Sequence, residues 1–187
     1  MKNKIFYLTG FMGAGKSTIG PILANTLGWE YFDLDKVIEE KLDMKIVEIF
    51  EKYGEKFFRE HERKILEEVS RNKSAIISLG GGTMANQVNI KLLKETGKII
   101  YLKATISSLF KRLEFKRDRP NLKIQDGEPT EEKLIKRITE LYNTREQYYI
   151  QSDFIVETDE KSIGVTVDRI ARIIHEENNK LKGKSGN

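Results

Sequence analysis

A chain of 187 residues can bury one sizeable hydrophobic core but is too short for two full-sized domains, so we expect residues 1–187 to form a single domain. Its 39% hydrophobic and 33% charged residues are typical of a soluble globular protein, and no apolar run approaches the roughly 20 residues of a membrane span, which excludes a membrane-spanning protein. The net charge of +4 is small, and the lack of cysteine excludes disulfides and thiolate metal sites and permits a reducing compartment, so we expect a cytoplasmic protein.

Short apolar strands alternate with helical patterns along the chain. The first strand is predicted at residues 5–8, and a helical pattern begins at Lys16 and is ended by Gly28. Further strands are predicted at residues 29–32, 74–79, 98–102 and 154–157. Strands this short and apolar, separated by helices, are typical of βαβ units that build a parallel sheet covered on both faces. The sequence therefore predicts a three-layer α/β/α fold.

Two segments depart from this alternation. Residues 34–71 carry a helical pattern that is far longer than one crossover needs, so we expect a substrate-binding excursion there. Residues 116–129 are polar and basic and contain Pro120 and Pro129, so we expect a mobile loop or lid. The basic residues 180–187 lack apolar periodicity and are expected to form a frayed, solvated end.

Basic side chains gather between residues 111 and 123, where Glu114 and Asp118 are the acidic residues that oppose them. Such a cluster attracts a polyanion, and nucleotide phosphate and nucleic acid are both candidates. Phe115 is the one aromatic residue in this stretch, and no nucleic-acid-binding signature occurs elsewhere in the sequence. We therefore expect a nucleotide ligand and no nucleic-acid partner.

Residues 10–17 match the phosphate-binding pattern G-x-x-x-x-G-K-[ST], between a predicted strand and a predicted helix. The glycines let successive backbone N–H groups converge on phosphate oxygens, and the helix N-terminus adds positive potential. Lys16 is expected to reach the terminal phosphates, and Ser17 to ligate Mg²⁺. The predicted nucleotide-binding residues of this loop are Gly13, Ala14, Gly15, Lys16, Ser17 and Thr18. Taken alone, the loop leaves a kinase, a GTPase and a motor ATPase open.

Two aspartates follow the second predicted strand. Because side chains alternate along an extended segment, Asp33 and Asp35 are expected on one side, facing the phosphate site. One carboxylate can then assist Mg²⁺, for which we select Asp33, while the other holds an acceptor hydroxyl. The alternative is that both acids cap the next helix and charge its first turn, and the two roles can coexist.

Two weaker features lie further along the chain. Arg59 and Glu62 have the i, i+3 spacing of neighbours on a helix, which alone indicates a solvated ion pair rather than a site. His61 between them is expected to be structural. Three glycines, residues 80–82, follow the third predicted strand, where backbone N–H groups approach ligands closely, and this position favours function over a flexible turn.

Taken together, these motifs resemble the shikimate kinase family. They are the phosphate-binding loop continued to Thr18, Asp33-x-Asp35, Phe58-Arg59-x-x-Glu62, Gly80-Gly81-Gly82, Arg119-Pro120 and Arg145-x-x-x-Tyr149. The resemblance spans residues 4–174 and implies a P-loop fold of the nucleoside-monophosphate-kinase type, with a five-stranded parallel sheet, a substrate-binding domain and a lid. It also implies transfer of the ATP γ-phosphoryl group to the 3-hydroxyl of shikimate with Mg²⁺, a step of aromatic amino acid biosynthesis.

The resemblance assigns the acceptor site residue by residue. Asp35 would bind the acceptor hydroxyl, and Arg59 and Arg145 would bind the shikimate carboxylate. Gly81 and Gly82 would bind the substrate through backbone groups. Guanidinium groups match a planar carboxylate bidentately, so two of them favour an acidic substrate over a neutral alcohol.

The resemblance also assigns the phosphoryl-transfer site. Lys16, Asp35 and Arg119 would be catalytic, with Arg119 closing from the lid and Arg112 lying against the nucleotide. Arg117 is a competing candidate for the lid role. Asn121 stands where the family usually continues Arg-Pro-Leu, which leaves lid packing less secure.

Two other functions remain open. A kinase for another small polyol acid, such as gluconate, would also explain the P-loop, the lid and the basic residues. A non-catalytic ligand sensor or nucleotide-driven switch is the alternative from a different class. We expect a monomer whose partners are ATP and shikimate, with no nucleic-acid or membrane partner.

Overall fold

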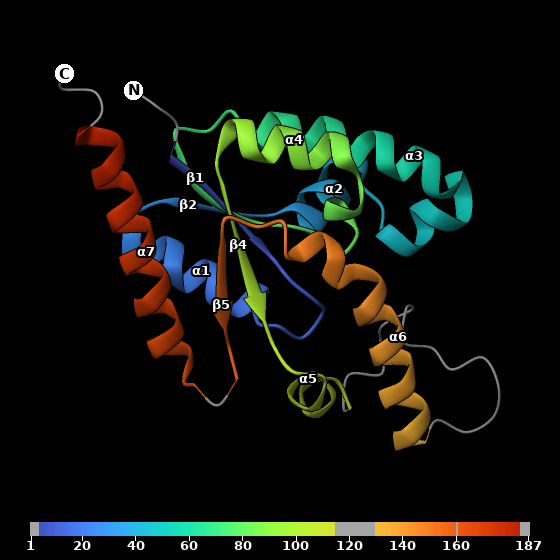
Figure 1. Ribbon diagram of the computed structural model, residues 1–187. Coiled ribbons are helices and arrows are strands. Elements are labelled where there is room, and N and C mark those ends of the chain that lie inside the picture. Colours follow the sequence, from blue (N-terminus) through green and yellow to red (C-terminus); the bar gives the residue numbers. More distant parts are fainter. Residues whose placement is uncertain (1–3, 115–129, 160, 184–187) are drawn as a thin grey trace.

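The computed structural model describes residues 4–114, 130–159 and 161–183, so the predicted lid at residues 116–129, including Arg119, lies outside the described residues. Figure 1 shows the described chain as a twisted sheet with helices packed on both sides. Helix α7 (Ile163–Gly183) continues past residue 180, where a frayed end had been expected. Within the described residues, no helix combines the length and the apolarity needed to cross a membrane.

Five parallel strands form the sheet of the described chain, in the order β2-β3-β1-β4-β5 (Figure 1). The strands are β1 Lys4–Thr9, β2 Glu30–Asp33, β3 Ser74–Ser78, β4 Lys98–Lys103 and β5 Phe154–Glu157. Strand β1 lies at the centre, where Phe6 pairs with Ile76 of β3 and Thr9 pairs with Tyr101 of β4. Each predicted strand overlaps an observed one, and the five-stranded parallel sheet is confirmed.

Helices cover the two faces of the sheet (Figure 1). Helix α1 (Lys16–Leu27) packs on one face beside α7. The elements on the other side include α3 (Ile46–Val69), α4 (Gln87–Thr96) and α6 (Glu131–Tyr149). On this second face, Tyr7 of β1 donates a hydrogen bond to Ser70 Oγ at 2.8 Å and shares another with Thr96 of α4 at 2.6 Å. These bonds satisfy a buried tyrosine hydroxyl and fasten two helices to the central strand.

The predicted excursion consists of two helices, α2 (Leu34–Leu42) and α3. Gly54 interrupts α3 with φ of 78°, a conformation that glycine adopts without strain. Aromatic pairs span this kink, because the rings of Phe50 and Phe58 lie 4.7 Å apart and those of Tyr53 and Phe57 lie 4.6 Å apart. The kink turns the start of α3 toward the end of the sheet where the loops after β1 and β3 lie.

Two short elements complete the described fold, η1 (Thr83–Ala85) after β3 and α5 (Ile106–Leu113) after β4. The loops after β1, β2 and β3 all leave the sheet at its carboxyl edge, because parallel strands end at the same side. Residues that follow these three strands therefore meet in space.

The packing of α1 on the sheet gives a stability prediction. A Cβ atom at Gly20 would collide with the ring of Tyr31 and lie 3.1 Å from Ser78 Oγ, so only glycine lets α1 approach β2 and β3 this closely. We expect Gly20→Ala to lower the free energy of unfolding by about 1 to 3 kcal/mol, as overpacked cores do, measured by urea denaturation. The control is Gly164→Ala in α7, where an added Cβ meets nothing within 4 Å and the better helix propensity stabilises by about 0.5 to 1 kcal/mol. Equal stability of Gly20→Ala and the native protein would contradict this packing.

Candidate active site

Two adjoining cavities lie at the carboxyl edge of the sheet. The smaller cavity, of about 220 Å³, lies between the loop after β1, the loop after β3 and helices α2 and α3. The larger cavity, of about 490 Å³, runs along residues 12–19 and reaches the segment after β5. Met12, Lys16 and Ser17 line both cavities. Ligands of open parallel sheets bind at this edge, so we take the pair of cavities as the candidate active site.

The loop between β1 and α1 has the backbone of an anion-binding turn. Gly13 and Gly15 have φ of 83° and 103°, which side-chain-bearing residues rarely adopt. Gly15 is also the N-cap of α1, so no side chain caps the N–H groups of the first turn beside the larger cavity. These donors and the positive end of the helix suit phosphate. All six residues predicted for this loop line the larger cavity: Gly13, Ala14, Gly15, Lys16, Ser17 and Thr18.

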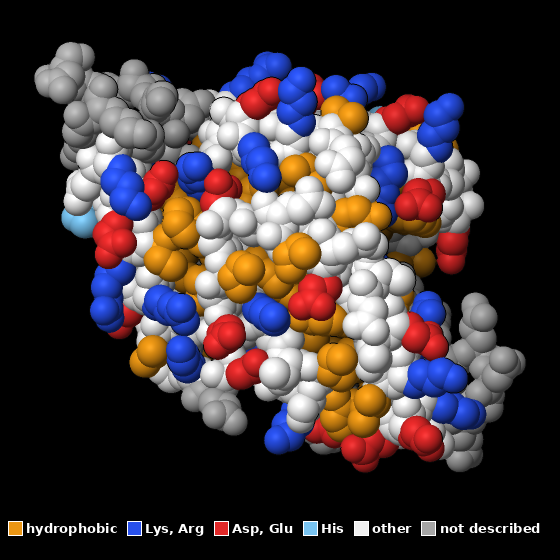
Figure 2. Space-filling model, in the orientation of Figure 1, with side chains coloured by type: hydrophobic (Ala, Val, Ile, Leu, Met, Phe, Trp, Pro, Cys, Tyr) orange, Lys and Arg blue, Asp and Glu red, His pale blue; other side chains and the backbone are white. Residues whose placement is uncertain are grey.

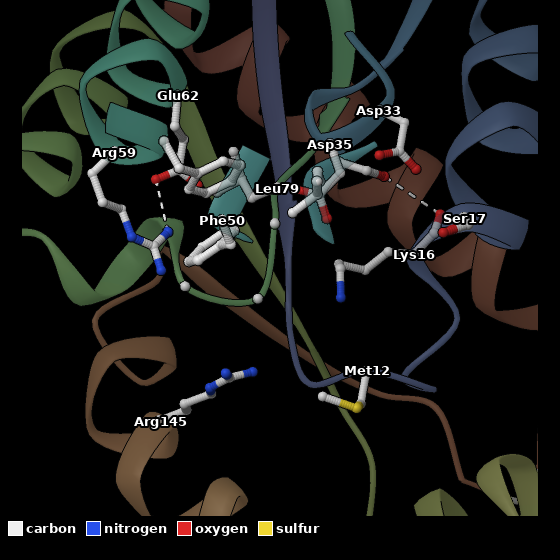
Figure 3. A pocket seen from close by; sticks show the side chains of 16 residues that line it. Met12, Lys16, Ser17, Asp33, Asp35, Phe50, Arg59, Glu62, Leu79 and Arg145 are labelled. Carbon is white, nitrogen blue, oxygen red and sulfur yellow. Dashed lines mark hydrogen bonds and ion pairs between the residues drawn. The ribbon is translucent and has the colours of Figure 1, made fainter. Parts of the chain in front are cut away.

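Lys16 lies where the two cavities meet. Its Nζ donates to the carbonyl oxygens of Gly10 and Phe11, at 2.6 and 3.3 Å. Figure 3 shows the ammonium group in the space between Asp35 and Met12. A cation in this position can pair with an anion bound in either cavity.

Arg112 of α5 closes one side of the larger cavity. It donates to Gly13 O at 3.2 Å and to Thr158 O at 2.9 Å, so it joins the phosphate-binding loop to the segment after β5. Three further residues of the cavity wall come from that segment and from α7, where no motif indicates ligand-binding residues. They are Lys161, Ile163 and Thr166.

The backbone at Asp33 and Asp35 differs from the extended arrangement expected from the sequence. Strand β2 ends at Asp33, which is the N-cap of α2 and accepts the Lys36 N–H at 3.5 Å, and Asp35 lies in the first helical turn. A cap at the end of the strand starts the helix earlier than side-chain alternation predicted. Both carboxylates still line the smaller cavity beside Ser17, and Asp35 packs so closely on Gly80 that no Cβ fits between them. Capping and a position in the cavity therefore coexist.

The surroundings of Asp35 change its acidity. Burial raises the pKa of its carboxyl to about 6, and the negative charges of Asp33 and Glu62 act in the same direction. Lys16 and Arg59 act in the opposite direction and limit the rise in pKa. A carboxyl of this pKa is largely ionised at pH 7 and remains a better proton acceptor than an ordinary aspartate.

Arg59 of α3 and Arg145 of α6 reach the smaller cavity from two different helices (Figure 3). A Cβ atom at Gly81 would lie 2.9 Å from Arg145 Nη1, and one at Gly82 would lie 2.7 Å from Arg59 Nη2. Glycine at both positions therefore lets the two guanidinium groups lie directly on the backbone after β3. Two such groups on one cavity suit a planar carboxylate.

Tyr149 was part of a sequence motif but had no assigned role. It lies one turn after Arg145 on α6, and its hydroxyl donates to Gly81 O at 3.1 Å. Burial raises the pKa of Tyr149 to about 12, so the hydroxyl remains a donor at neutral pH. This bond fastens the helix that carries Arg145 to the glycine segment.

Arg59 is held by carboxylates on two sides. Its Nη1 donates to Glu62 Oε2 at 3.0 Å, and its Nε and Nη2 donate to Glu55 Oε1 at 3.2 and 3.1 Å. Although burial opposes the charged form of Arg59, the two carboxylates raise its pKa. The expectation of a solvated Arg59–Glu62 pair is wrong, because the Glu62 side chain is only 1% exposed. Glu62 is thus a site residue that spacing on one helix could not identify.

Apolar side chains that could not be identified from the sequence form a wall of the smaller cavity. They are Met12, Ile46, Phe50, Phe58 and Leu79. Ile46 and Phe50 come from the part of α3 before the kink at Gly54, and Phe58 comes from the part after it. A wall of this kind beside charged groups suits a small ligand with a carbon ring.

Ser17 and Asp33 both line the smaller cavity and carry the oxygen atoms that Mg²⁺ prefers. In the described part of the chain, no group of three or more His, Cys, Asp or Glu is arranged to hold a metal ion. Mg²⁺ usually keeps waters and takes one or two protein oxygens together with phosphate oxygens, so this pair fits such an ion.

Comparison with known proteins agrees with the resemblance drawn from the motifs. The sequence model of the shikimate kinase family matches residues 12–175. The shikimate kinase of Chlorobium chlorochromatii is 43% identical over 171 residues, which cover 91% of this chain and 90% of that protein. The shikimate kinase of Chlorobaculum parvum is 43% identical over 173 residues, which cover 92% of each protein.

Solved structures give the same result. The shikimate kinase of Bacteroides thetaiotaomicron superimposes with a TM-score of 0.81 at 31% identity, covering 92% of this chain and 98% of that chain. The shikimate kinase of Acinetobacter baumannii in complex with shikimate superimposes with a TM-score of 0.83 at 30% identity, covering 94% of each chain. The chain therefore belongs to the shikimate kinase family.

Proposed function

We propose that this protein transfers the γ-phosphoryl group of ATP to the 3-hydroxyl of shikimate, giving ADP and shikimate 3-phosphate. The observation that carries the proposal is that the two cavities share a wall. Lys16 and Ser17 of the phosphate-binding loop line the larger cavity, and they also line the smaller cavity, which contains two arginines. A nucleotide in the larger cavity and an acidic acceptor in the smaller one would meet at Lys16. Family membership supports the same substrates.

The acceptor would be oriented from two ends. Arg59 and Arg145 would pair with its carboxylate, and Gly81 and Gly82 would contact it through the backbone, since all four residues line the smaller cavity. Asp35 would hold the 3-hydroxyl and accept its proton as the bond between that oxygen and the γ-phosphorus forms. The bond from the γ-phosphorus to the bridging oxygen breaks, and ADP leaves.

The transferred group would be stabilised by charge rather than by a covalent intermediate. Lys16 would neutralise the γ-phosphoryl group, and Arg112 would hold the loop and the nucleotide wall together. Ser17 and Asp33 would hold Mg²⁺, which supplies further neutralisation of the phosphates when bound. Arg119 is proposed as the lid arginine, because residues 116–129 connect α5, which carries Arg112, to α6, which carries Arg145.

We further propose that the enzyme acts as a cytoplasmic monomer with no nucleic-acid or membrane partner. The two cavities of one chain supply groups for both substrates, and ATP is available in the cytoplasm. On the face shown in Figure 2, basic and acidic side chains are interspersed.

The substrate prediction is tested by a coupled assay of ADP release with shikimate, gluconate and nucleoside monophosphates side by side. We expect rapid release only when shikimate, ATP and Mg²⁺ are all present, because one cavity joins a carboxylate-binding pair of arginines to Asp35. Equal turnover of gluconate would show that the acceptor is wrong. ADP release that no acceptor stimulates would support a nucleotide-driven switch instead.

The arginine pair gives a binding prediction. Truncating Arg59 or Arg145 to Ala should weaken shikimate binding by about 2 to 5 kcal/mol, because the substrate carboxylate loses a charge-assisted partner. Isothermal titration should show no matching loss of ATP affinity. The control is Arg63→Ala, which removes an exposed arginine one turn after Arg59 whose partner is Glu67. An equal loss of ATP and shikimate affinity in the Arg59 and Arg145 variants would contradict the assignment.

The buried Asp35 carboxyl gives a pH prediction. Its pKa of about 6 in the folded protein lies above the ordinary 3.8, so the native state binds more protons than the unfolded state between these values. Native stability is therefore lost as the pH rises from about 4 to about 6, and Asp35→Asn escapes this loss. The variant should gain about 2 to 3 kcal/mol over the native protein at pH 7.5 and almost nothing at pH 4, measured by urea denaturation.

The matched control for this prediction is Asp168→Asn, which removes an exposed carboxyl from α7. Its effect on stability should stay within about 0.5 kcal/mol at both pH values. A stability difference between Asp35→Asn and the native protein that does not change with pH would show that Asp35 is not perturbed by burial.

A further inference from the structure

A buried hydrogen bond connects the end of the glycine segment to α3. The Thr83 hydroxyl donates to Glu62 Oε1 at 2.8 Å, and the other oxygen of Glu62 accepts from Arg59 Nη1 at 3.0 Å. Thr83 is 0% exposed and Glu62 is 1% exposed, so water does not compete for this carboxylate. One hydroxyl and one guanidinium group thus hold the two oxygens of a single buried carboxylate.

The backbone of Thr83 is itself held by two hydrogen bonds. Its N–H donates to Gly80 O at 3.3 Å as η1 begins, and its carbonyl accepts from the buried Asn89 Nδ2 of α4 at 3.1 Å. The hydroxyl therefore extends from a fixed backbone position. A continuous set of bonds runs from Asn89 through Thr83 and Glu62 to Arg59.

The same contacts set the distance between Arg59 and the glycine segment. Gly82, the neighbour of Thr83, lies so close to Arg59 that an added Cβ would be 2.7 Å from Nη2. If Glu62 moved, Arg59 would lose the partner that fixes its Nη1 edge against this backbone. Thr83 does not line the cavity, but Glu62 does, so the Thr83 hydroxyl can act on a ligand through Glu62 and the Arg59 that Glu62 holds.

We propose that Thr83 is a positioning residue for the substrate carboxylate, because its hydroxyl fixes Glu62 and Glu62 fixes Arg59. The inference rests on the proposed function, since it presumes that Arg59 binds the carboxylate of shikimate. Removing the hydroxyl leaves one oxygen of a buried carboxylate without a donor, and the side chain then reorients to find another. The guanidinium group keeps its bonds to Glu55 but loses the partner that fixes its Nη1 edge, so the substrate carboxylate binds less tightly.

The test is Thr83→Val, which removes the O–H group and keeps the branched shape. We expect the KM for shikimate to rise about tenfold, while the KM for ATP and kcat change less than twofold, because the hydroxyl acts on ground-state carboxylate binding. Thr83→Ser, which restores the donor, should return the KM for shikimate to within about twofold of the native value.

The control is Thr96→Val. Thr96 also makes a side-chain hydrogen bond between a helix and the sheet, to Tyr7 at 2.6 Å. Unlike Glu62, the partner of Thr83, Tyr7 does not line either cavity. This variant should lower the melting temperature and leave the KM for shikimate unchanged. A rise in KM with Thr96→Val equal to that with Thr83→Val would show a general loss of packing and overturn the proposal.

A double-mutant cycle separates positioning from other effects. If Thr83 acts through Arg59, then Thr83→Val should raise the KM for shikimate less than twofold in an Arg59→Ala background. The same factor in both backgrounds, or a native KM for Thr83→Val, overturns the proposal. Loss of the fold in both Thr83 variants also overturns it, because folding would then require the whole threonine side chain. Failure of the native protein to phosphorylate shikimate is a different outcome and refutes the proposed function itself.

Discussion

The candidate site depends on three consecutive positions after β3 that have no side chain. At residues 80, 81 and 82, a Cβ atom would meet charged groups from three helices, α2, α6 and α3 in that order. The groups are Asp35, Arg145 and Arg59. Protein interiors are close-packed, so side chains at these positions would push the three helices apart rather than be absorbed by empty space. Leaving them out lets groups far apart in the sequence converge on one short piece of backbone.

This convergence brings like charges together, and the surrounding contacts limit the loss of stability. Asp33, Asp35 and Glu62 lie close enough to one another to raise the pKa of Asp35 together with its burial. The three carboxylates have different surroundings. Asp33 accepts a backbone N–H, and Glu62 accepts from a hydroxyl and a guanidinium group. The positive charges of Lys16 and Arg59 act on Asp35 and limit the rise in its pKa. At neutral pH the buried Asp35 carboxyl is charged, so the protein is less stable than it would be with an uncharged residue at this position. Such a loss of stability at functional residues is common.

Most of the fold could be predicted because its signals are local. Helix α1 begins at Lys16 and is capped by Gly28, as predicted, and all five strands were found from short apolar runs. Asp35 was predicted to lie on an extended strand, whereas it lies in the first turn of α2. The sequence around it fits both a strand with alternating side chains and a helix capped by Asp33, and the sequence alone does not distinguish the two. The burial of Glu62 could not be predicted from its helix, since it depends on Thr83, 21 residues further along the chain. Arg145 was identified from a family motif, because nothing local distinguishes it from other arginines on α6.

The geometry of the smaller cavity also bears on how the protein would discriminate between an acid with a six-membered carbon ring and an open-chain acid of similar charge. Both carry a carboxylate that the proposed Arg59–Arg145 pair would bind, so this pair would reject only neutral alcohols, which would leave two guanidinium groups without an anion. The second criterion is the fixed spacing between that pair and Asp35, because all three lie against one glycine segment. A ring holds its carboxylate and hydroxyl at one separation, whereas an open chain must give up several freely rotating bonds to match it. Under the proposed function, this spacing would favour a rigid substrate, and the apolar wall that includes Phe50 and Phe58 would cover the carbon face of such a ring.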